Sequence, residues 1–308
     1  MKQVTLVLGA GGPVGHAFHA GMLRALADGL EWDPRAAHRV VGTSAGAQVA
    51  ALLRAGMSAD DLSARVMGHA MTEAGAAVAR HWTRPEQDHE ELGPAPAYEP
   101  ASREYLRRVL RRPWTIRPGP FFSALLPRGR VCLEPQRQGL RNLFGDEWPE
   151  EQLWITAVCL HSGERVAFGR EGAPEVDVGT AVASSGSVPS ISIPVAAAGR
   201  HFVDGGMASA THLDLLHDVE EDGIVVVSSP LSMIPPMRIL LALEVRRLQA
   251  AGKHVITLEP TGTASAAMGW NPMDTQRAAR VAEATYDEVR AALESPRLQR
   301  ALTGPQRR

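Results

Sequence analysis

Lysine is nearly absent from this chain of 308 residues, in which only Lys2 and Lys253 occur and arginine carries almost all of the positive charge. The 32 Lys and Arg residues nearly balance the 34 Asp and Glu residues, so the formal net charge is −2. A protein that binds nucleic acid over a broad surface usually carries a clear positive charge. The composition therefore excludes a global nucleic-acid-binding signature, and we attribute the preference for arginine to a GC-rich coding sequence.

Cysteine and long apolar runs are also scarce. The two cysteines, Cys132 and Cys159, match no metal-ligand spacing, and each lies among apolar residues, so we expect buried free thiols in a reducing compartment. No run approaches the ~20 apolar residues that span a bilayer. Residues 1–3 lead directly into a short strand, where a secretory signal would have an apolar segment. These features predict a cytoplasmic protein.

The length of 308 residues suits one large α/β domain or two small ones, and the composition that remains, 44% hydrophobic and 21% charged, is that of an ordinary globular protein. Strand-like runs alternate with helix-like patterns, which predicts a largely parallel sheet covered by helices on both faces. The alternation is lost at about 69–150, which we interpret as an inserted helical or irregular cap. We expect a single domain at 1–295 and a polar, basic tail at 296–308. The expected strands are 4–8, 40–42, 153–160, 165–168, 195–198, 201–203, 224–227 and 254–258.

The sequence Gly42-Thr43-Ser44-Ala45-Gly46 joins a short apolar run to an alanine-rich helical pattern. In a strand–turn–helix context, Gly-x-Ser-x-Gly forms a nucleophile elbow that exposes the serine hydroxyl at the amino end of a helix. Its two glycines let the chain turn where side chains would collide. Because the motif alone also fits a simple turn, other parts of the sequence must decide whether Ser44 is a nucleophile.

A second glycine-rich segment, at 9–15, lies between the first strand and the first helix. Backbone N–H groups in such a loop converge beside the positive end of the helix dipole and bind phosphate or an oxyanion. A dinucleotide-binding fingerprint is disfavoured, because Ala10 replaces a required glycine and no acidic residue ends the second strand. A P-loop is excluded by the lack of Gly-Lys-Ser/Thr.

A nucleophilic serine needs a base that accepts its proton. Three histidines follow Ser44 in the order found in α/β-hydrolases: His212, His217 and His254. The elbow of that fold comes after several strands, whereas one strand precedes it here. Asp204 is the better candidate, because it ends a predicted strand and should emerge at the carboxyl edge of the sheet beside Ser44. Gly205 and Gly206 follow it and permit a close approach of the backbone.

The predicted cap contains a basic region at 103–126. A helix expected at 102–112 carries several arginines, and aromatic residues follow it. Its apolar side should consist of Tyr105, Leu106, Val109 and Leu110. Such a helix can bind a membrane surface or can pack its apolar side on the protein with its arginines in solvent. We favour packing and keep peripheral membrane contact through 103–126 as a hypothesis. The acidic, proline-rich stretch 86–100 is expected to be an exposed loop.

Three motifs in sequence order resemble those of the patatin-like phospholipases. They are the glycine-rich loop after the first strand, Gly-x-Ser-x-Gly at Ser44, and Asp-Gly-Gly at Asp204. The similarity extends to 183–189, 202–206 and 269–274, the last being familiar from bacterial members. It spans most of the chain, and about 80–150 is the least similar part. Three motifs in this order and spacing are jointly far more specific than any one of them.

The resemblance implies a three-layer α/β/α fold and a Ser–Asp dyad that hydrolyses phospholipids or other acyl esters, without a metal or diffusible cofactor. Ser44 would be the nucleophile that becomes acylated, and Asp204 the base that takes its proton and later activates water. The N–H groups of Gly11 and Gly12 would form the oxyanion hole. The supporting motif positions are Gly15, Gly42, Gly46, Gly205 and Gly206.

Two positions depart from the family's pattern. Val14 stands where the family often has Arg or Lys, and Ala10 stands where the first glycine of the loop is usual. Neither change removes an oxyanion N–H, but both bear on loop conformation and on the handling of an anionic headgroup. Gln48, one turn into the elbow helix, is a candidate supporting contact or a solvated residue.

Two other functions remain open. An acyltransferase would use the same dyad and pass the acyl group to an alcohol or amine. A non-catalytic protein that binds a lipid or a partner on this fold would need neither dyad residue, so the presence of both Ser44 and Asp204 argues against it.

Overall fold

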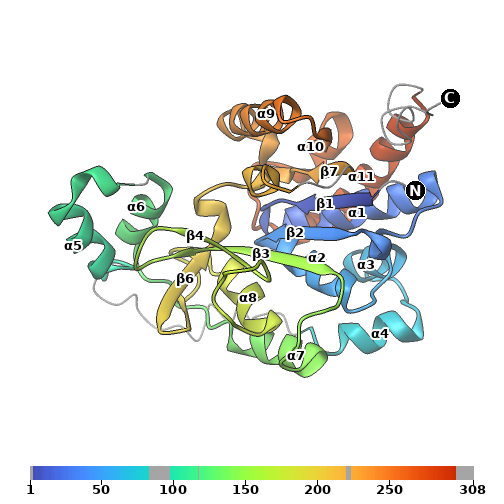
Figure 1. Ribbon diagram of the computed structural model, residues 1–308. Coiled ribbons are helices and arrows are strands. Elements are labelled where there is room, and N and C mark those ends of the chain that lie inside the picture. Colours follow the sequence, from blue (N-terminus) through green and yellow to red (C-terminus); the bar gives the residue numbers. More distant parts are fainter. Residues whose placement is uncertain (1–2, 83–97, 117, 220–222, 296–308) are drawn as a thin grey trace.

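The computed structural model describes residues 3–82, 98–116, 118–219 and 223–295, and within them an eight-stranded sheet lies between layers of helices (Figure 1). The strand order is β5-β6-β3-β2-β1-β7-β8, and β4 pairs with β3. The strands are β1 Gln3–Leu8, β2 Arg39–Thr43, β3 Gln152–Cys159, β4 Arg165–Phe168, β5 Val195–Ala197, β6 Arg200–Asp204, β7 Gly223–Ser228 and β8 His254–Leu258. The predicted three-layer α/β/α fold with a mostly parallel sheet is confirmed.

The helices fill the long connections between the strands. They are α1 Gly12–Leu30, α2 Ala45–Arg54, α3 Ala59–Met67, α4 Glu73–Ala79, α5 Arg103–Arg111, α6 Pro118–Leu125, α7 Glu134–Phe144, α8 Val178–Ser185, α9 Pro235–Ala250, α10 Gly262–Met268 and α11 Ala278–Leu293. Short 3₁₀ helices are η1 Pro34–Ala36, η2 Pro113–Thr115, η3 Gly205–Met207, η4 Leu213–Leu216, η5 Pro230–Met233 and η6 Thr275–Arg277.

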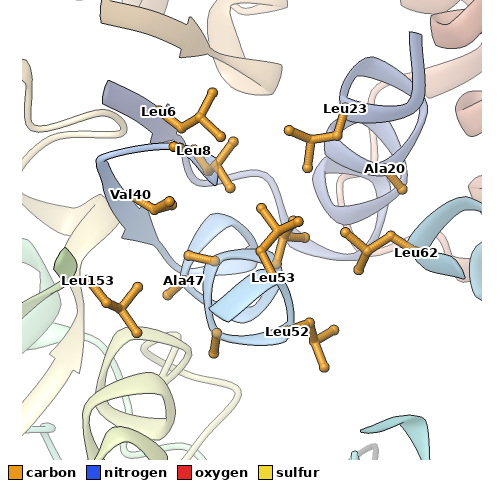
Figure 2. Close-up of a cluster of buried hydrophobic side chains, with 14 of the residues drawn as sticks. Leu6, Leu8, Ala20, Leu23, Val40, Ala47, Leu52, Leu53, Leu62 and Leu153 are labelled. Atoms are coloured by element: carbon orange, nitrogen blue, oxygen red, sulfur yellow. The ribbon is translucent and has the colours of Figure 1, made fainter. Parts of the chain in front are cut away.

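Strands β3, β2, β1, β7 and β8 are parallel, and both of their faces are buried. Leu6 and Leu8 of β1 belong to the core cluster that contains α1 and α2, which Figure 2 shows in close-up. Val7, which lies between them, belongs to a second cluster with Leu241 and Leu248 of α9. Successive side chains of a strand point to opposite faces, so strands covered on both sides consist of continuous apolar runs.

The other edge of the sheet is antiparallel. β6 pairs with β3 and with β5 in the antiparallel sense, and β4 returns along β3 as a hairpin. β6 therefore does not end at the carboxyl edge in the way that a parallel strand would. Its last residue, Asp204, instead lies opposite Ala157 in the body of β3.

The predicted cap at 69–150 consists of two different parts. α7 packs against α8 so closely that a Cβ on Gly179 would lie 2.3 Å from the carbonyl oxygen of Arg137. α5 and α6 instead form their own small cluster of Tyr105, Val109 and Ala124. This pair lies beyond the layered body, at the left of Figure 1.

Several sequence expectations need correction or lie outside the described residues. Cys159 is buried, but Cys132 is exposed. Leu110 does not share the packed side of α5 and is exposed. Most of the expected loop at 86–100 and the whole tail at 296–308 fall outside the described residues. Among the helices that are described, none has the length and apolarity needed to cross a bilayer.

Candidate active site

Ser44 occupies a strained turn between β2 and α2. Its φ of 55° and ψ of −117° form a combination that residues with a side chain rarely adopt. A Cβ on Gly46 would lie 1.9 Å from the carbonyl oxygen of Leu8, and one on Gly42 would lie 2.5 Å from Cα of Ala47. The two motif glycines therefore let α2 start directly against the sheet, which produces the predicted elbow geometry.

Asp204 reaches Ser44 through the antiparallel strand. Thr43, the last residue of β2, pairs with Thr156 of β3, and Asp204 pairs with the next residue, Ala157. The hydroxyl groups of Thr43 and Thr156 are 2.8 Å apart and join the two strands at this point. Asp204 thus lies beside Ser44 as expected, and β6 reaches this position by running antiparallel to β3.

The Asp204 carboxylate is buried and accepts two hydrogen bonds. The Ser44 side chain donates one, and the Gly206 N–H donates the other to Oδ1 over 2.7 Å. Burial raises the pKa of Asp204 to about 6, and the two hydrogen bonds offset part of this increase because they stabilise the charged form. A carboxylate with such a pKa is suited to accept a proton near neutral pH.

The two glycines that follow Asp204 have different roles: Gly205 lets the turn approach β3, and Gly206 donates a hydrogen bond to the carboxylate. A Cβ on Gly205 would lie 2.5 Å from Oγ1 of Thr156. Gly206 supplies the N–H that holds the carboxylate. The Asp-Gly-Gly turn thus packs against β3 at Thr156, whose hydroxyl group also contacts that of Thr43 at the end of β2.

The carboxyl end of α8 holds both members of the pair. The Ser44 N–H donates to Oγ of Ser185 over 2.8 Å, although 140 residues separate them in the chain. The Asp204 N–H donates to the carbonyl oxygen of Ser187 over 2.9 Å. Both serines are buried. Sequence analysis matched this segment to a family motif but assigned no role to Ser185 or Ser187.

The glycine loop places two backbone donors at the amino end of α1. Gly9 and Ala10 use their N–H groups in 2.9 Å bonds to Ser228 and Ala210. The N–H groups of Gly11 and Gly12 make no hydrogen bond with any described residue. A Cβ on Gly11 would lie 2.6 Å from Cα of Gly15, so the loop folds tightly onto the first turn of its own helix.

A buried histidine holds the beginning of this loop. His19 Nε2 lies 2.8 Å from the carbonyl oxygen of Gly9, and Nδ1 lies 2.7 Å from Oγ of Ser228. Burial lowers the pKa of His19 to about 4, so the ring is neutral at neutral pH. The neutral ring donates from Nε2 to Gly9 and accepts the Ser228 hydroxyl proton at Nδ1.

The two departures from the family pattern have different surroundings. Val14 is buried in the cluster formed by α1, α10 and α11, so it does not contribute to a headgroup site. Ala10 lies against the Asp-Gly-Gly turn, because a Cβ on Gly206 would be 3.1 Å from its Cβ. The glycine loop and the turn after Asp204 are therefore neighbours.

None of the three candidate histidines lines the pocket that contains Ser44. His212 is buried, its Nε2 lies 2.9 Å from the carbonyl oxygen of Gly205, and burial lowers its pKa to about 4. His217 is exposed beside Asp218. His254 begins β8 at the amino edge of the parallel strands. His212 thus contacts the backbone of the Asp-Gly-Gly turn. The three histidines therefore lose support as alternatives to Asp204.

A pocket of about 510 Å³ opens onto Ser44 and Gly12. Its apolar lining includes Val66, Val131, Leu133, Val188, Ile191 and Met273. Its polar lining includes His16, Gln48, Arg65, Gln136 and Ser192. No Asp or Glu from the described part of the chain lines it. The predicted contact residue Gln48 is therefore at the pocket, and His16, which sequence analysis did not consider, is there too.

Metal ligation finds no support in the described residues, where no group of three or more His, Cys, Asp and Glu side chains is placed to hold an ion. The arrangement instead combines a serine hydroxyl, a carboxylate in contact with it and two backbone N–H groups beside an apolar pocket. These are the components of nucleophilic acyl transfer. The fold and the site thus define an α/β protein with a serine at a strand–helix turn, a buried carboxylate beside it and a pocket that opens onto the serine.

The chain matches the sequence model of the patatin-like phospholipase family over residues 6–217, and it belongs to this family. The comparison with curated proteins gave no match. Membership agrees with the resemblance that the three sequence motifs indicated.

Three solved structures are similar to this chain at low identity. VipD from Legionella pneumophila is 15% identical with a TM-score of 0.42, and the match covers 95% of this chain and 66% of that chain. The type III effector protein ExoU is 19% identical with a TM-score of 0.37, with 97% and 54% covered. The ExoU–SpcU complex of Pseudomonas aeruginosa gives 17% identity, a TM-score of 0.42, and 98% and 52% covered. This chain thus spans about half to two-thirds of the length of these proteins.

Replacing Ser185 by Ala should lower kcat for ester hydrolysis about 10- to 100-fold and change KM little. The change leaves the buried Ser44 N–H without its acceptor, which costs about 1–3 kcal/mol and releases the strained elbow. Steady-state kinetics with an acyl ester, together with thermal unfolding, measure the effect.

The neighbouring Ser184→Ala is the matched control. Ser184 is also buried in α8, but its hydroxyl has no hydrogen-bond partner among the described residues, so its loss should leave kcat within about twofold. Ser185→Thr, which retains a hydroxyl, should recover part of the rate. Equal kinetics for Ser185→Ala and Ser184→Ala would refute the positioning role.

Proposed function

We propose that this protein is a lipid acyl hydrolase that works through an acyl-enzyme on Ser44. The observation that carries the proposal is the hydrogen bond between the Ser44 side chain and the buried Asp204 carboxylate, at a pocket with an apolar wall. Family membership supports the same chemistry. The substrate is an acyl ester whose chain lies against the apolar lining.

In the first half-reaction, Oγ of Ser44 attacks the ester carbonyl carbon while its proton moves to Asp204. The carbonyl oxygen becomes an oxyanion, which accepts hydrogen bonds from the N–H groups of Gly11 and Gly12. Pro13 follows them and has no N–H to add. Collapse of the tetrahedral intermediate releases the alcohol, which takes the proton from Asp204 and leaves Ser44 acylated.

In the second half-reaction, Asp204 takes a proton from water, and the resulting hydroxide attacks the acyl-enzyme. The carboxylic acid leaves, and the proton returns to Ser44. An acyltransferase would differ only in the acceptor, with an alcohol or amine in place of water. A non-catalytic binder would have no use for the strained elbow, which costs about 1–3 kcal/mol to maintain.

Hydrolysis of a p-nitrophenyl acyl ester tests the proposal. The purified protein should release nitrophenol, and Ser44→Ala and Asp204→Asn should each reduce kcat/KM at least about 10³-fold, because the nucleophile or its base is lost. Ser162→Ala, on the turn between β3 and β4, is the control and should retain the wild-type rate. Hydrolysis that persists in Ser44→Ala would contradict the proposal.

We also propose that α5 and α6 dock on an anionic membrane surface. Leu110, Trp114 and Phe122 are 82%, 78% and 62% exposed, which is unusual for three large apolar side chains within one short segment. The exposed guanidinium groups of Arg107 and Arg108 lie on the same helix as Leu110. Aromatic residues flanked by arginines are typical of interfacial elements. The pair packs on η3, directly after Asp204, where a Cβ on Gly119 would lie 1.7 Å from the carbonyl oxygen of Met207.

Reversing two of these charges, Arg107→Glu with Arg108→Glu, should weaken binding to phosphatidylserine vesicles at least about tenfold, since each cation near an anionic surface contributes about 1 kcal/mol. Vesicle co-sedimentation measures the change. The exposed pair Arg246→Glu with Arg280→Glu makes the same change in net charge elsewhere and should have little effect. Unchanged binding of the first variant would eliminate the docking proposal.

A further inference from the structure

Gln136 is a buried polar residue in the wall of the Ser44 pocket. It lies in the first turn of α7, directly after the pocket residues Val131 and Leu133, and is 1% exposed. Neither Oε1 nor Nε2 of its carboxamide has a hydrogen-bond partner among the described residues. One residue in the lining of the Ser44 pocket thus carries both a donor and an acceptor that no described residue uses.

An unpaired buried carboxamide is costly. Each buried polar group without a partner costs about 1–3 kcal/mol, and the large majority of such groups in folded proteins are paired. The same helix contains a glutamine in the ordinary situation, because Gln138 is exposed and its Nε2 donates to Oδ1 of Asn142 over 2.8 Å. No described residue compensates for this cost at Gln136, which points to a ligand.

The carboxamide is also able to adjust to a ligand. No hydrogen bond to the described protein fixes its terminal torsion, and that torsion has a broad energy minimum in glutamine. The segment before α7 is fixed, because the N–H groups of Arg130 and Val131 both donate to the carbonyl oxygen of Ile191 over 2.8 and 2.9 Å. Gln136 therefore combines a fixed backbone position with a carboxamide whose two polar atoms are covered in this conformation and must turn toward the pocket to meet a ligand.

We propose that Gln136 binds a free hydroxyl group of the substrate, and that the preferred substrates are monoacyl esters of a polyol, such as monoacylglycerols or lysophospholipids. The inference rests on the proposed acyl hydrolase function. A hydroxyl accepts from Nε2 and donates to Oε1, so it satisfies both amide atoms. A fully acylated glycerol backbone offers only acceptors and leaves Oε1 unpaired. The size of the pocket agrees, because about 510 Å³ is typical for one small-molecule ligand.

The test uses ligands that the protein cannot hydrolyse. 1-O-decylglycerol has two free hydroxyl groups next to an ether, and its 2,3-di-O-methyl derivative has none. Isothermal titration below the micellar concentration of each ligand should show that the wild-type protein binds the diol at least about tenfold more tightly, because the dimethyl ether leaves a buried acceptor unpaired. In Gln136→Leu this ratio should fall to about one.

Two controls separate binding from folding. Gln136→Leu should be at least as stable to heat as the wild type, since it removes two unpaired polar atoms from the interior. Gln138→Leu makes the same substitution two residues away on the exposed side of α7 and should keep the wild-type preference for the diol.

An equal preference for the diol in wild type and Gln136→Leu would overturn the inference, as would a wild-type protein that binds the two ethers equally or binds neither. Hydrolysis of a p-nitrophenyl ester in parallel distinguishes this failure from failure of the proposed function. Ser44-dependent hydrolysis without the binding preference refutes only the role of Gln136. The binding preference without hydrolysis supports the hydroxyl site and refutes catalysis.

Discussion

The site depends on the direct contact between the amino end of α2 and the ends of β1 and β2. Gly46 packs so closely on Leu8 that no side chain fits, and this contact forces Ser44 into its strained conformation. Such strain costs about 1–3 kcal/mol. Leu52 and Leu53, about two helical turns further along α2, are fully buried in the core and contribute about 1.5–3 kcal/mol each, which offsets it. The core thus holds Ser44 in this conformation at the pocket, although the residue is only 6% exposed.

The same burial determines the chemistry of the base. Because Asp204 lies in the interior, its pKa rises toward neutrality, which suits the proposed proton transfer from Ser44 without an intervening histidine. The two fully buried histidines serve the backbone instead. His19 binds the carbonyl group of Gly9 at the start of the glycine-rich loop, and His212 binds that of Gly205 in the turn after Asp204. Each is neutral because burial lowers its pKa.

The fold class, the elbow and the glycine loop could be predicted from the sequence because each depends on neighbours in the chain. Asp204 was found through its motif, whereas the antiparallel pairing of its strand with β3 joins segments that are distant in the sequence and leaves no local pattern. Ser185 accepts a hydrogen bond from Ser44, which is 141 positions away in the chain. Gln136 is distinguished by a carboxamide without a hydrogen-bond partner among the described residues, so neither residue leaves a local sequence pattern. Helical periodicity placed Leu110 on the packed side of α5. Periodicity does not show how much of that side is covered, and in the structure Tyr105 and Val109 are buried whereas Leu110 is exposed.

The central claim, that Asp204 alone activates Ser44, is tested most directly by the rate of Ser44 labelling with a fluorophosphonate as a function of pH, followed by intact mass spectrometry. Below its pKa of about 6 Asp204 is protonated and cannot accept the serine proton, so labelling should be slow, rise through pH 6 and level off above pH 7. Asp204→Asn should abolish the rise. Labelling that is unchanged in Asp204→Asn, or that requires a histidine, would contradict the account.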